Sequence, residues 1–169
     1  GLCVHKKGEK EPTVLSDAPS ISPPTLTRDH VVFGGLDGKL HVVPIQGGKG
    51  QALDTSFGAS ITAPVAVSGG RAYAACEDGY VYVYGKDGRA QYPTKDLGVK
   101  EVRSPLSGPM AADKYNWYSN YGDFQGSNAN DQGLKPPLRM RWARRLECTV
   151  KHLPVCGGGR MYMHTAEGQ

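Results

Sequence analysis

The sequence predicts an all-β fold built from a repeated four-stranded antiparallel unit. Glycine and proline are abundant, at 23 and 12 of 169 residues, which favours short strands joined by tight turns over long helices. A pattern that begins near Ile21 returns about 40 residues later near Ile61. Hydrophobic residues make up 38% of the chain, which is enough for a packed core.

Two copies of the unit match each other over residues 21–44 and 61–85, and each continues into a fourth strand. A proline opens the first strand of each copy, where its missing N–H does least harm. A turn and a second strand follow, and then Asp37-Gly38 or Asp78-Gly79 predicts a hairpin into a third strand, because these residues tolerate positive φ. The later strands are expected at residues 31–35, 39–43 and 51–55 in the first copy, and at 71–76, 80–84 and 90–94 in the second.

A third copy begins near Leu153 and stops within the unit. Pro154 takes the place of the opening proline, Gly159-Arg160 matches Gly70-Arg71, and Glu167-Gly168 takes the place of the Asp-Gly pair. The chain then ends at residue 169, before the returning strand. We count about two and a half units, and we expect further polypeptide, either a missing part of the chain or another chain, to complete the fold.

The repeat resembles that of the bacterial PQQ-like (pyrroloquinoline-quinone-like) β-propellers over residues 21–92, and in part over residues 138–169. The resemblance rests on the apolar-Pro opening, the glycine turn, the aromatic-rich strand, the Asp-Gly pair and the Val-Tyr-Val-Tyr run of residues 81–84. Residues 138–142 resemble the outer strand that carries this family's characteristic tryptophan, although the first two copies carry Leu53 and Tyr92 near that place.

The resemblance implies a partial β-propeller of four-stranded antiparallel blades, in a periplasmic, secreted or cell-surface protein. Complete propellers have roughly four to eight blades, so about two and a half are present here. The expected regions are an N-terminal extension at 1–20, two blades at 21–95, an irregular aromatic- and Asn-rich insertion at 96–136, and the truncated start of a further blade at 137–169.

The insertion is the first candidate for function. Loops of this length in compact domains are usually functional or disordered, and aromatic residues argue against disorder. Exposed aromatic rings would serve as plates for a sugar or a partner protein. In the alternative interpretation Trp117 plugs the space between blades, because residues 117–123 resemble a segment that opens a propeller in this family. The candidate binding residues are Trp117, Tyr118, Tyr121 and Phe124.

The run Arg-Met-Arg-Trp-Ala-Arg-Arg at 139–145 is the densest basic segment. It is either a solvated outer strand or a contact for phosphate, an acidic glycan or an acidic partner. In a regular strand, alternate residues share a face. We therefore expect Arg139, Arg141 and Ala143 on one face and Met140, Trp142 and Arg144 on the other, with Arg139, Arg141 and Arg144 as candidate binding residues.

Metal sites and disulfides have weaker sequence support. The series Cys148, His152, Cys156 and His164 has the ligand types that zinc accepts, but its spacing is not that of a zinc finger. A Cys148–Cys156 disulfide and buried free thiols are the alternatives. A calcium site through Asp123 and Asp131 lacks the spacing of an EF-hand.

No catalytic or cofactor motif stands out. The chain has neither a G-x-S-x-G nor an H-E-x-x-H sequence. The PQQ-dependent dehydrogenases of this superfamily bind their quinone through adjacent cysteines, a stacking tryptophan and a calcium shell, and this chain has no adjacent cysteine pair. We therefore predict no cofactor. The net charge of +4 is mostly interspersed, which argues against a general nucleic-acid binder, and no apolar run is long enough to cross a membrane.

These observations favour a non-catalytic interaction or scaffold module that binds a partner protein or surface. One alternative is a part of a PQQ-dependent dehydrogenase-like enzyme whose site lies outside this chain. Another alternative is a carbohydrate-binding surface on the aromatic insertion. Enzymatic activity stays open at this point, and the partner is expected to be a protein, the chain that completes the propeller, or a glycan.

Overall fold

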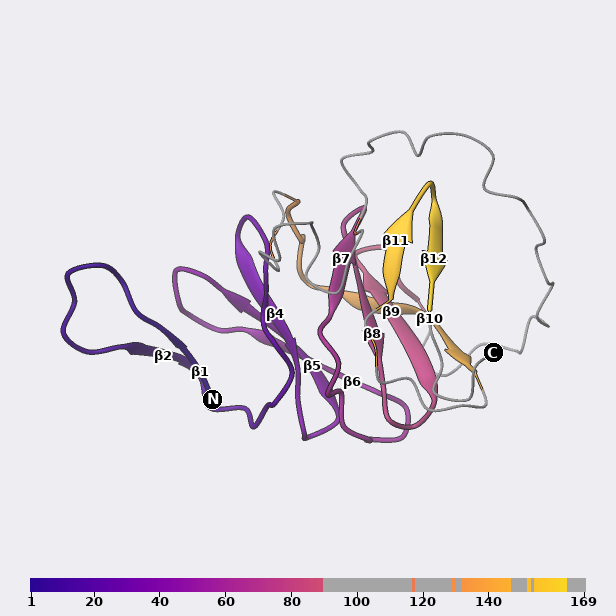
Figure 1. Ribbon diagram of the computed structural model, residues 1–169, viewed down its shortest axis with the longest axis horizontal. Coiled ribbons are helices and arrows are strands. Elements are labelled where there is room, and N and C mark those ends of the chain that lie inside the picture. The colour runs from indigo at the N-terminus through magenta and orange to yellow at the C-terminus, as the bar shows by residue number, and fades with distance from the viewer. Residues whose placement is uncertain (90–116, 118–128, 130–131, 147–151, 153, 164–169) are drawn as a thin grey trace.

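The computed structural model describes residues 1–89, 117, 129, 132–146, 152 and 154–163. Its first sheet is formed by four consecutive strands, β3 (Thr25–Leu26), β4 (His30–Gly34), β5 (Lys39–Pro44) and β6 (Gln51–Asp54). They pair antiparallel in chain order as a meander, to the left of the centre in Figure 1. This sheet confirms the first predicted four-stranded unit.

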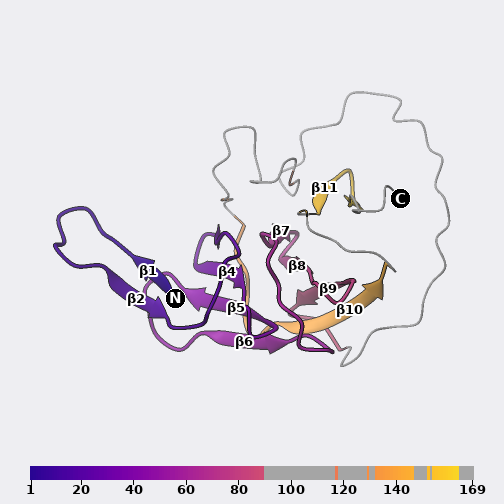
Figure 2. The ribbon, with the colours of Figure 1, turned by 60° about the horizontal axis from the view of Figure 1, so that its bottom comes forward.

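The second sheet begins in the same way but ends with a distant strand. Strands β7 (Ala66–Ser68), β8 (Arg71–Ala75) and β9 (Tyr80–Gly85) form the predicted meander. The fourth strand is β10 (Arg139–Arg145), which pairs antiparallel with β9 and runs beside it in Figure 2. The aromatic insertion therefore separates the third and fourth strands of one sheet.

This pairing corrects one detail of the strand assignment. Residues 139–145 complete the second sheet, whereas the sequence places them at the start of a further unit. The segment 90–94, predicted as the fourth strand, lies outside the described residues. A sheet edge takes whichever strand satisfies its N–H and C=O groups, and sequence proximity does not decide which strand that is.

Two short hairpins flank the sheets. Strands β11 (Val155–Gly157) and β12 (Arg160–Tyr162) form the start of the third predicted unit. Strands β1 (Leu2–Val4) and β2 (Thr13–Ser16) form a hairpin inside the N-terminal extension, where no strand was predicted. Strands of three or four residues are too short to show a clear period-2 pattern, which explains why the sequence did not reveal them.

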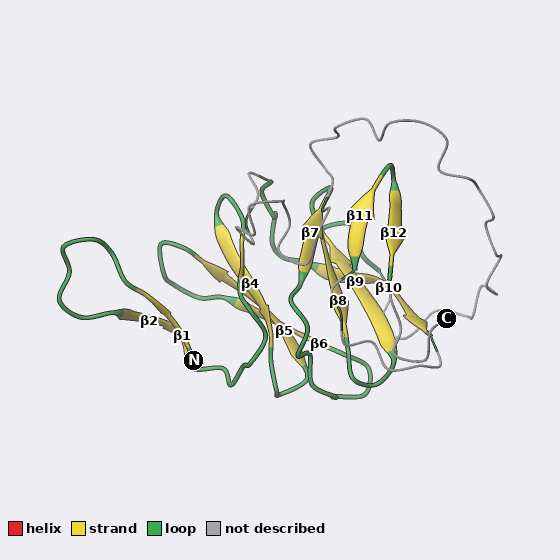
Figure 3. Cartoon of the chain, viewed as in Figure 1, coloured by secondary structure: helices red, strands yellow, loops and turns green. Residues whose placement is uncertain are grey.

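The described secondary structure consists of strands alone, as Figure 3 shows, which confirms the all-β class. Every paired strand runs antiparallel to its neighbour within these sheets. The described part of the chain has no helix of the length and apolar character that a membrane span requires.

The two four-stranded sheets pack face to face around the main hydrophobic core. Leu40 and Val42 of the first sheet meet Tyr82 and Tyr84 of the second, all nearly inaccessible to solvent. Hydrogen bonds cross the interface: the Tyr84 hydroxyl donates to the Asp54 carbonyl at 3.1 Å. The hairpin β11–β12 lies on the opposite face of the second sheet, so the layers follow chain order from left to right in Figure 1.

The Asp-Gly pairs close hairpins that are one residue longer than a two-residue turn. In the first sheet the Gly35 N–H donates to the Lys39 carbonyl, and the Gly38 N–H donates to the Gly35 carbonyl. This is the three-residue loop in which the last position is left-handed. Gly38 has a φ of 74° and Gly79, at the same place in the second sheet, has a φ of 80°. The predicted need for positive φ is confirmed.

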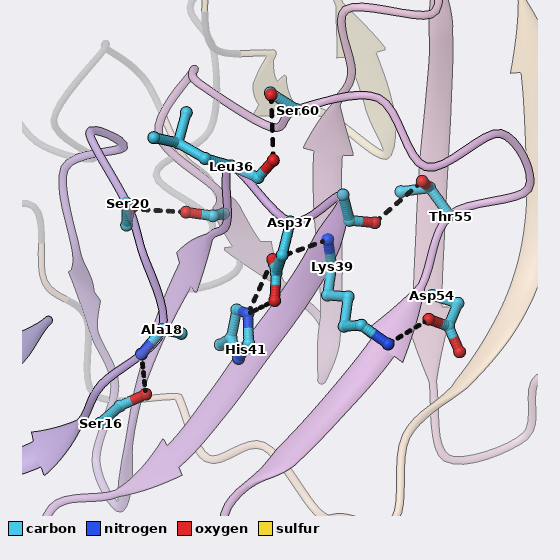
Figure 4. A network of polar contacts seen from close by, with 12 residues as sticks. Ser16, Ala18, Ser20, Leu36, Asp37, Lys39, His41, Asp54, Thr55 and Ser60 are labelled. Carbon is cyan, nitrogen blue, oxygen red and sulfur yellow. Dashed lines mark hydrogen bonds and ion pairs between the residues drawn. The ribbon is translucent and has the colours of Figure 1, made fainter.

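The aspartates of these turns hold the same two kinds of partner in both sheets. Each carboxylate accepts the backbone N–H two residues later, and each meets a side chain four residues later on the returning strand. Asp37 lies 3.1 Å from Nε2 of His41 (Figure 4), and the His41 ring stacks on Phe33. Asp78 accepts a hydrogen bond from the Tyr82 hydroxyl at 2.6 Å. Burial, with this hydrogen bond, raises the pKa of Tyr82. These carboxylates serve the turns.

Candidate functional site

The face of the second sheet that turns away from the first sheet carries charged and polar side chains. In β8, Ala72 and Ala74 point into the main core. Their neighbours Arg71 and Tyr73 therefore lie on the other face, because side chains alternate along a strand. Arg71 lies opposite Gly85 of β9 in the antiparallel pairing of the two strands. A strand that is apolar on one side thus presents an arginine and a tyrosine on the other.

A β-bulge in β10 brings two further large side chains to this outer face. The pairing with β9 shifts register between Met140 and Trp142, so Arg141 is the extra residue. Met140 and Ala143 both point into the main core, and Arg141 and Trp142 both line the outer face. The sequence predicted regular alternation, with Arg141 and Trp142 on opposite faces of the strand, and this prediction is wrong. The inserted residue breaks the period of two.

The hairpin β11–β12 forms the facing wall of a groove. Trp117 joins it to the second sheet: the backbone N–H of Trp117 donates to the Cys156 carbonyl at 2.7 Å, and the reverse bond measures 2.8 Å. The indole packs against Ala66 of β7. Between this wall and the sheet lies a cavity of about 400 Å³, a volume typical of small ligand sites, with Arg160 and Met161 on the hairpin side.

A second cavity of about 330 Å³ adjoins the first, and Arg71 and Arg141 line both. Asp87 is the one acidic side chain among the described residues that line these cavities, and it pairs with Arg141 at 2.6 Å. Asp87 is 64% exposed, so this ion pair is screened by water and contributes little. We call the two cavities together the basic groove, and its cationic side chains are Arg71, Lys86, Lys135, Arg141 and Arg160.

Gly85 forms the floor beneath the two central arginines. A Cβ at this position would lie 3.1 Å from Cδ of Arg141 and 3.4 Å from Cγ of Arg71. The absence of a side chain at Gly85 therefore lets the two arginines, from strands on either side of β9, lean toward each other. Tyr73 lies beside them: burial raises the pKa of its hydroxyl, and the charges of Arg71 and Arg141 act in the opposite direction.

The basic groove has the chemistry of anion recognition. Planar guanidinium groups donate paired hydrogen bonds to carboxylates and phosphates. A tyrosine hydroxyl is ordinarily protonated at neutral pH, and burial raises the pKa of Tyr73 further, so this hydroxyl is a further donor. Within the described ranges, no cluster of three or more His, Cys, Asp or Glu side chains is arranged to hold a metal ion. Several proposed metal ligands, Cys148, His164, Asp123 and Asp131, lie outside those ranges.

The predicted site residues have different outcomes. Arg141 lines the groove, whereas Arg139 and Arg144 are not among its lining residues. Trp117 is 0% exposed, so its ring is a packing element and offers no plate to a ligand. Tyr118, Tyr121 and Phe124 lie outside the described residues.

Two groove residues were missed although the sequence carried a signal for them. Arg71 and Arg160 each follow a Gly-Gly turn and begin the second strand of a repeat unit. The two turns have nearly the same geometry, with φ values of 57° and 72° at Gly69 and Gly70 and of 57° and 71° in the other turn. The same repeat position carries an arginine in both units, and stacking of the units places both arginines in the lining of one cavity.

The described cysteines should differ sharply in reactivity. Cys3 is exposed, whereas burial raises the pKa of Cys156 to about 11 and that of Cys76 to about 12. Because the thiolate is the nucleophile, we expect iodoacetamide at about pH 8 to alkylate Cys3 far faster than the other two. As the pH is raised, alkylation of Cys156 should begin to increase at a lower pH than alkylation of Cys76. Peptide-resolved mass spectrometry measures each rate, and fast labelling of Cys76 in the folded protein would contradict its burial.

Comparisons with protein-family models, with curated proteins and with solved structures find no match to this chain. No relative therefore suggests an activity, a substrate or a partner. The basic groove supplies the chemistry on which a functional proposal can rest.

Proposed function

We propose that this chain is a non-catalytic interaction module and that the basic groove is the place where it binds its partner. One observation carries the proposal: Arg71 and Arg141 lean together over Gly85, and among the described residues that line the groove Asp87 is the single carboxylate that balances the cations. Like charges held close together repel each other, and an anionic partner would relieve that repulsion.

The repeat architecture belongs to the same proposal. Two antiparallel four-stranded sheets and a further hairpin, stacked in chain order, are compatible with successive blades of a PQQ-like β-propeller. Such a propeller would continue in further polypeptide or in another chain. The groove would then lie between two neighbouring blades, and the protein would be periplasmic, secreted or on the cell surface.

The described residues favour binding over catalysis. The turn carboxylates Asp37 and Asp78 are held by backbone and side-chain partners, and His41 is packed between Asp37 and Phe33. The carbohydrate alternative is weakened because the ring of Trp117 is fully buried. Nothing among the described residues favours the dehydrogenase alternative.

Site-specific cross-linking tests the proposed function. The photoreactive amino acid p-benzoylphenylalanine replaces Trp142, an aromatic residue that lines the groove, and the protein is irradiated in an extract of the cells that make it. We expect a cross-linked partner that is lost when Arg141→Glu is added. The matched control is Arg145→Glu, at the exposed end of the same strand, which should leave the cross-link intact. Equal cross-linking in the two variants overturns the proposal. The absence of any cross-link in the parent protein, which carries only the photoreactive residue, overturns it as well.

A further inference from the structure

We infer that the partner binds the basic groove through an acidic peptide segment, in which carboxylates flank an apolar side chain. This inference rests on the proposed function and names the chemical class of the partner. It follows from how the charges are distributed, from the kind of cation at the centre of the groove, and from the apolar part of its lining.

The cations of the groove are spread along it. Lys86 and Lys135 line one cavity, Arg160 lines the other, and Arg71 and Arg141 lie where the two cavities meet. A single inorganic anion would be matched by cations that converge on one point. A row of cations instead suits a row of anions, and alternate side chains of an extended peptide follow one another about every 7 Å on the same side.

The central cations are arginines, which suit ligands that present two oxygens side by side, such as a carboxylate. A guanidinium presents a rigid fork of N–H donors that matches the two oxygens of a carboxylate, whereas an ammonium acts as a point charge. The floor at Gly85 lets the side chains of Arg71 and Arg141 approach each other, and a peptide carboxylate would compete with the exposed Asp87 for the fork of Arg141. The hydroxyl of Tyr73, on the same face of β8, is positioned to add a neutral donor beside them.

The larger cavity also has an apolar wall. The half-buried ring of Trp142 comes from β10 and the thioether of Met161 comes from β12. Aromatic rings and methionine accept aliphatic or aromatic side chains of varied shape. A peptide with one apolar residue among its acidic residues fills this wall, whereas inorganic phosphate has no group to place there. The mixed lining thus favours a peptide over an inorganic anion.

The test uses three fluorescein-labelled synthetic peptides of equal length: an acidic peptide Glu-Glu-Leu-Glu-Glu, a neutral one with Gln in place of Glu, and an acidic one with Ser in place of Leu. Fluorescence anisotropy measures binding to the full chain at low salt and at about 0.15 M salt. We expect the acidic leucine peptide to bind, the neutral peptide not to bind measurably, and the serine peptide to bind about tenfold more weakly. Binding of the neutral peptide equal to that of the acidic one overturns the inference.

Variants locate the binding in the groove. Arg71→Gln and Arg141→Gln should each lower the affinity for the acidic peptide by about tenfold or more, since each removes a charge-assisted hydrogen-bond fork. Arg145→Gln is the matched control on the same strand and should change the affinity by no more than about twofold. Circular dichroism on each variant shows that the sheets are intact. An unchanged affinity in both groove variants overturns the inference.

Competitors separate an acidic peptide from other anions, and the cross-linking experiment separates this inference from the proposed function. A sulfated oligosaccharide, a short single-stranded oligonucleotide or inorganic phosphate that binds tighter than the peptide overturns the peptide class. If no peptide binds while the cross-link at Trp142 still depends on Arg141, the inference fails and the proposed function stands. If the cross-link is also absent, both fail.

Discussion

Replacing Gly38 with Ala should lower the free energy of unfolding by about 3 kcal/mol or more. Gly38 has a φ of 74°, where an L side chain costs about 1–2 kcal/mol. A Cβ there would also lie 2.5 Å from the carbonyl carbon of Gly58, and closer still to its oxygen. Both neighbours are backbone atoms, which cannot rotate away as a flexible side chain can, so the first sheet must distort.

Gly47 provides the matched control for this substitution. Its φ of 85° is similar, but no atom lies within 4 Å of the place where its Cβ would stand. Gly47→Ala should therefore cost only the strain of the left-handed backbone, about 1–2 kcal/mol. Urea unfolding followed by circular dichroism measures both losses. Equal losses for the two variants would show that the close approach of Gly38 to Gly58 does not limit the fold.

Replacing Trp117 with Ala should detach the hairpin β11–β12 from the second sheet. Removal of a fully buried aromatic side chain typically costs about 3–5 kcal/mol, because a cavity remains where the ring was. The ring of Trp117 packs with Ala66 and Cys156 in a cluster separate from the main core. The loss should therefore be local. Hydrogen exchange should quicken in residues 155–162, and protection in residues 80–85 should persist.

Two further tryptophan variants serve as controls for Trp117→Ala. Trp117→Phe keeps an aromatic ring and removes a buried Nε1 that has no hydrogen-bond partner among the described residues, so it should cost only about 1 kcal/mol. Trp142→Ala, in the partly exposed wall of the groove, should weaken peptide binding with little loss of stability. If residues 155–162 stay protected in Trp117→Ala, the indole does not hold the hairpin in place.

Much of the fold could be predicted because its signals are local. Asp78-Gly79 and Gly69-Gly70 allow the backbone to turn where few other residues do, and the segments between such turns can only be short strands. In β9 valine and tyrosine alternate because successive side chains point to opposite faces of a strand, and both kinds are buried over residues 81–84. Such patterns depend on neighbours in the chain, so the order and the approximate bounds of the meander strands followed from them.

The sequence by itself thus determined the all-β class, the turns and the repeat, whereas the tertiary structure decided how distant segments meet. It paired β10 with β9 across an interval of about 50 residues, which is possible because loop-closure entropy grows only slowly with loop length. It placed a bulge at Arg141, buried Trp117, and brought Arg71, Arg141 and Arg160 to one groove. None of these features has a local signal strong enough to identify it, because each depends on which surface the rest of the chain leaves unpaired or uncovered.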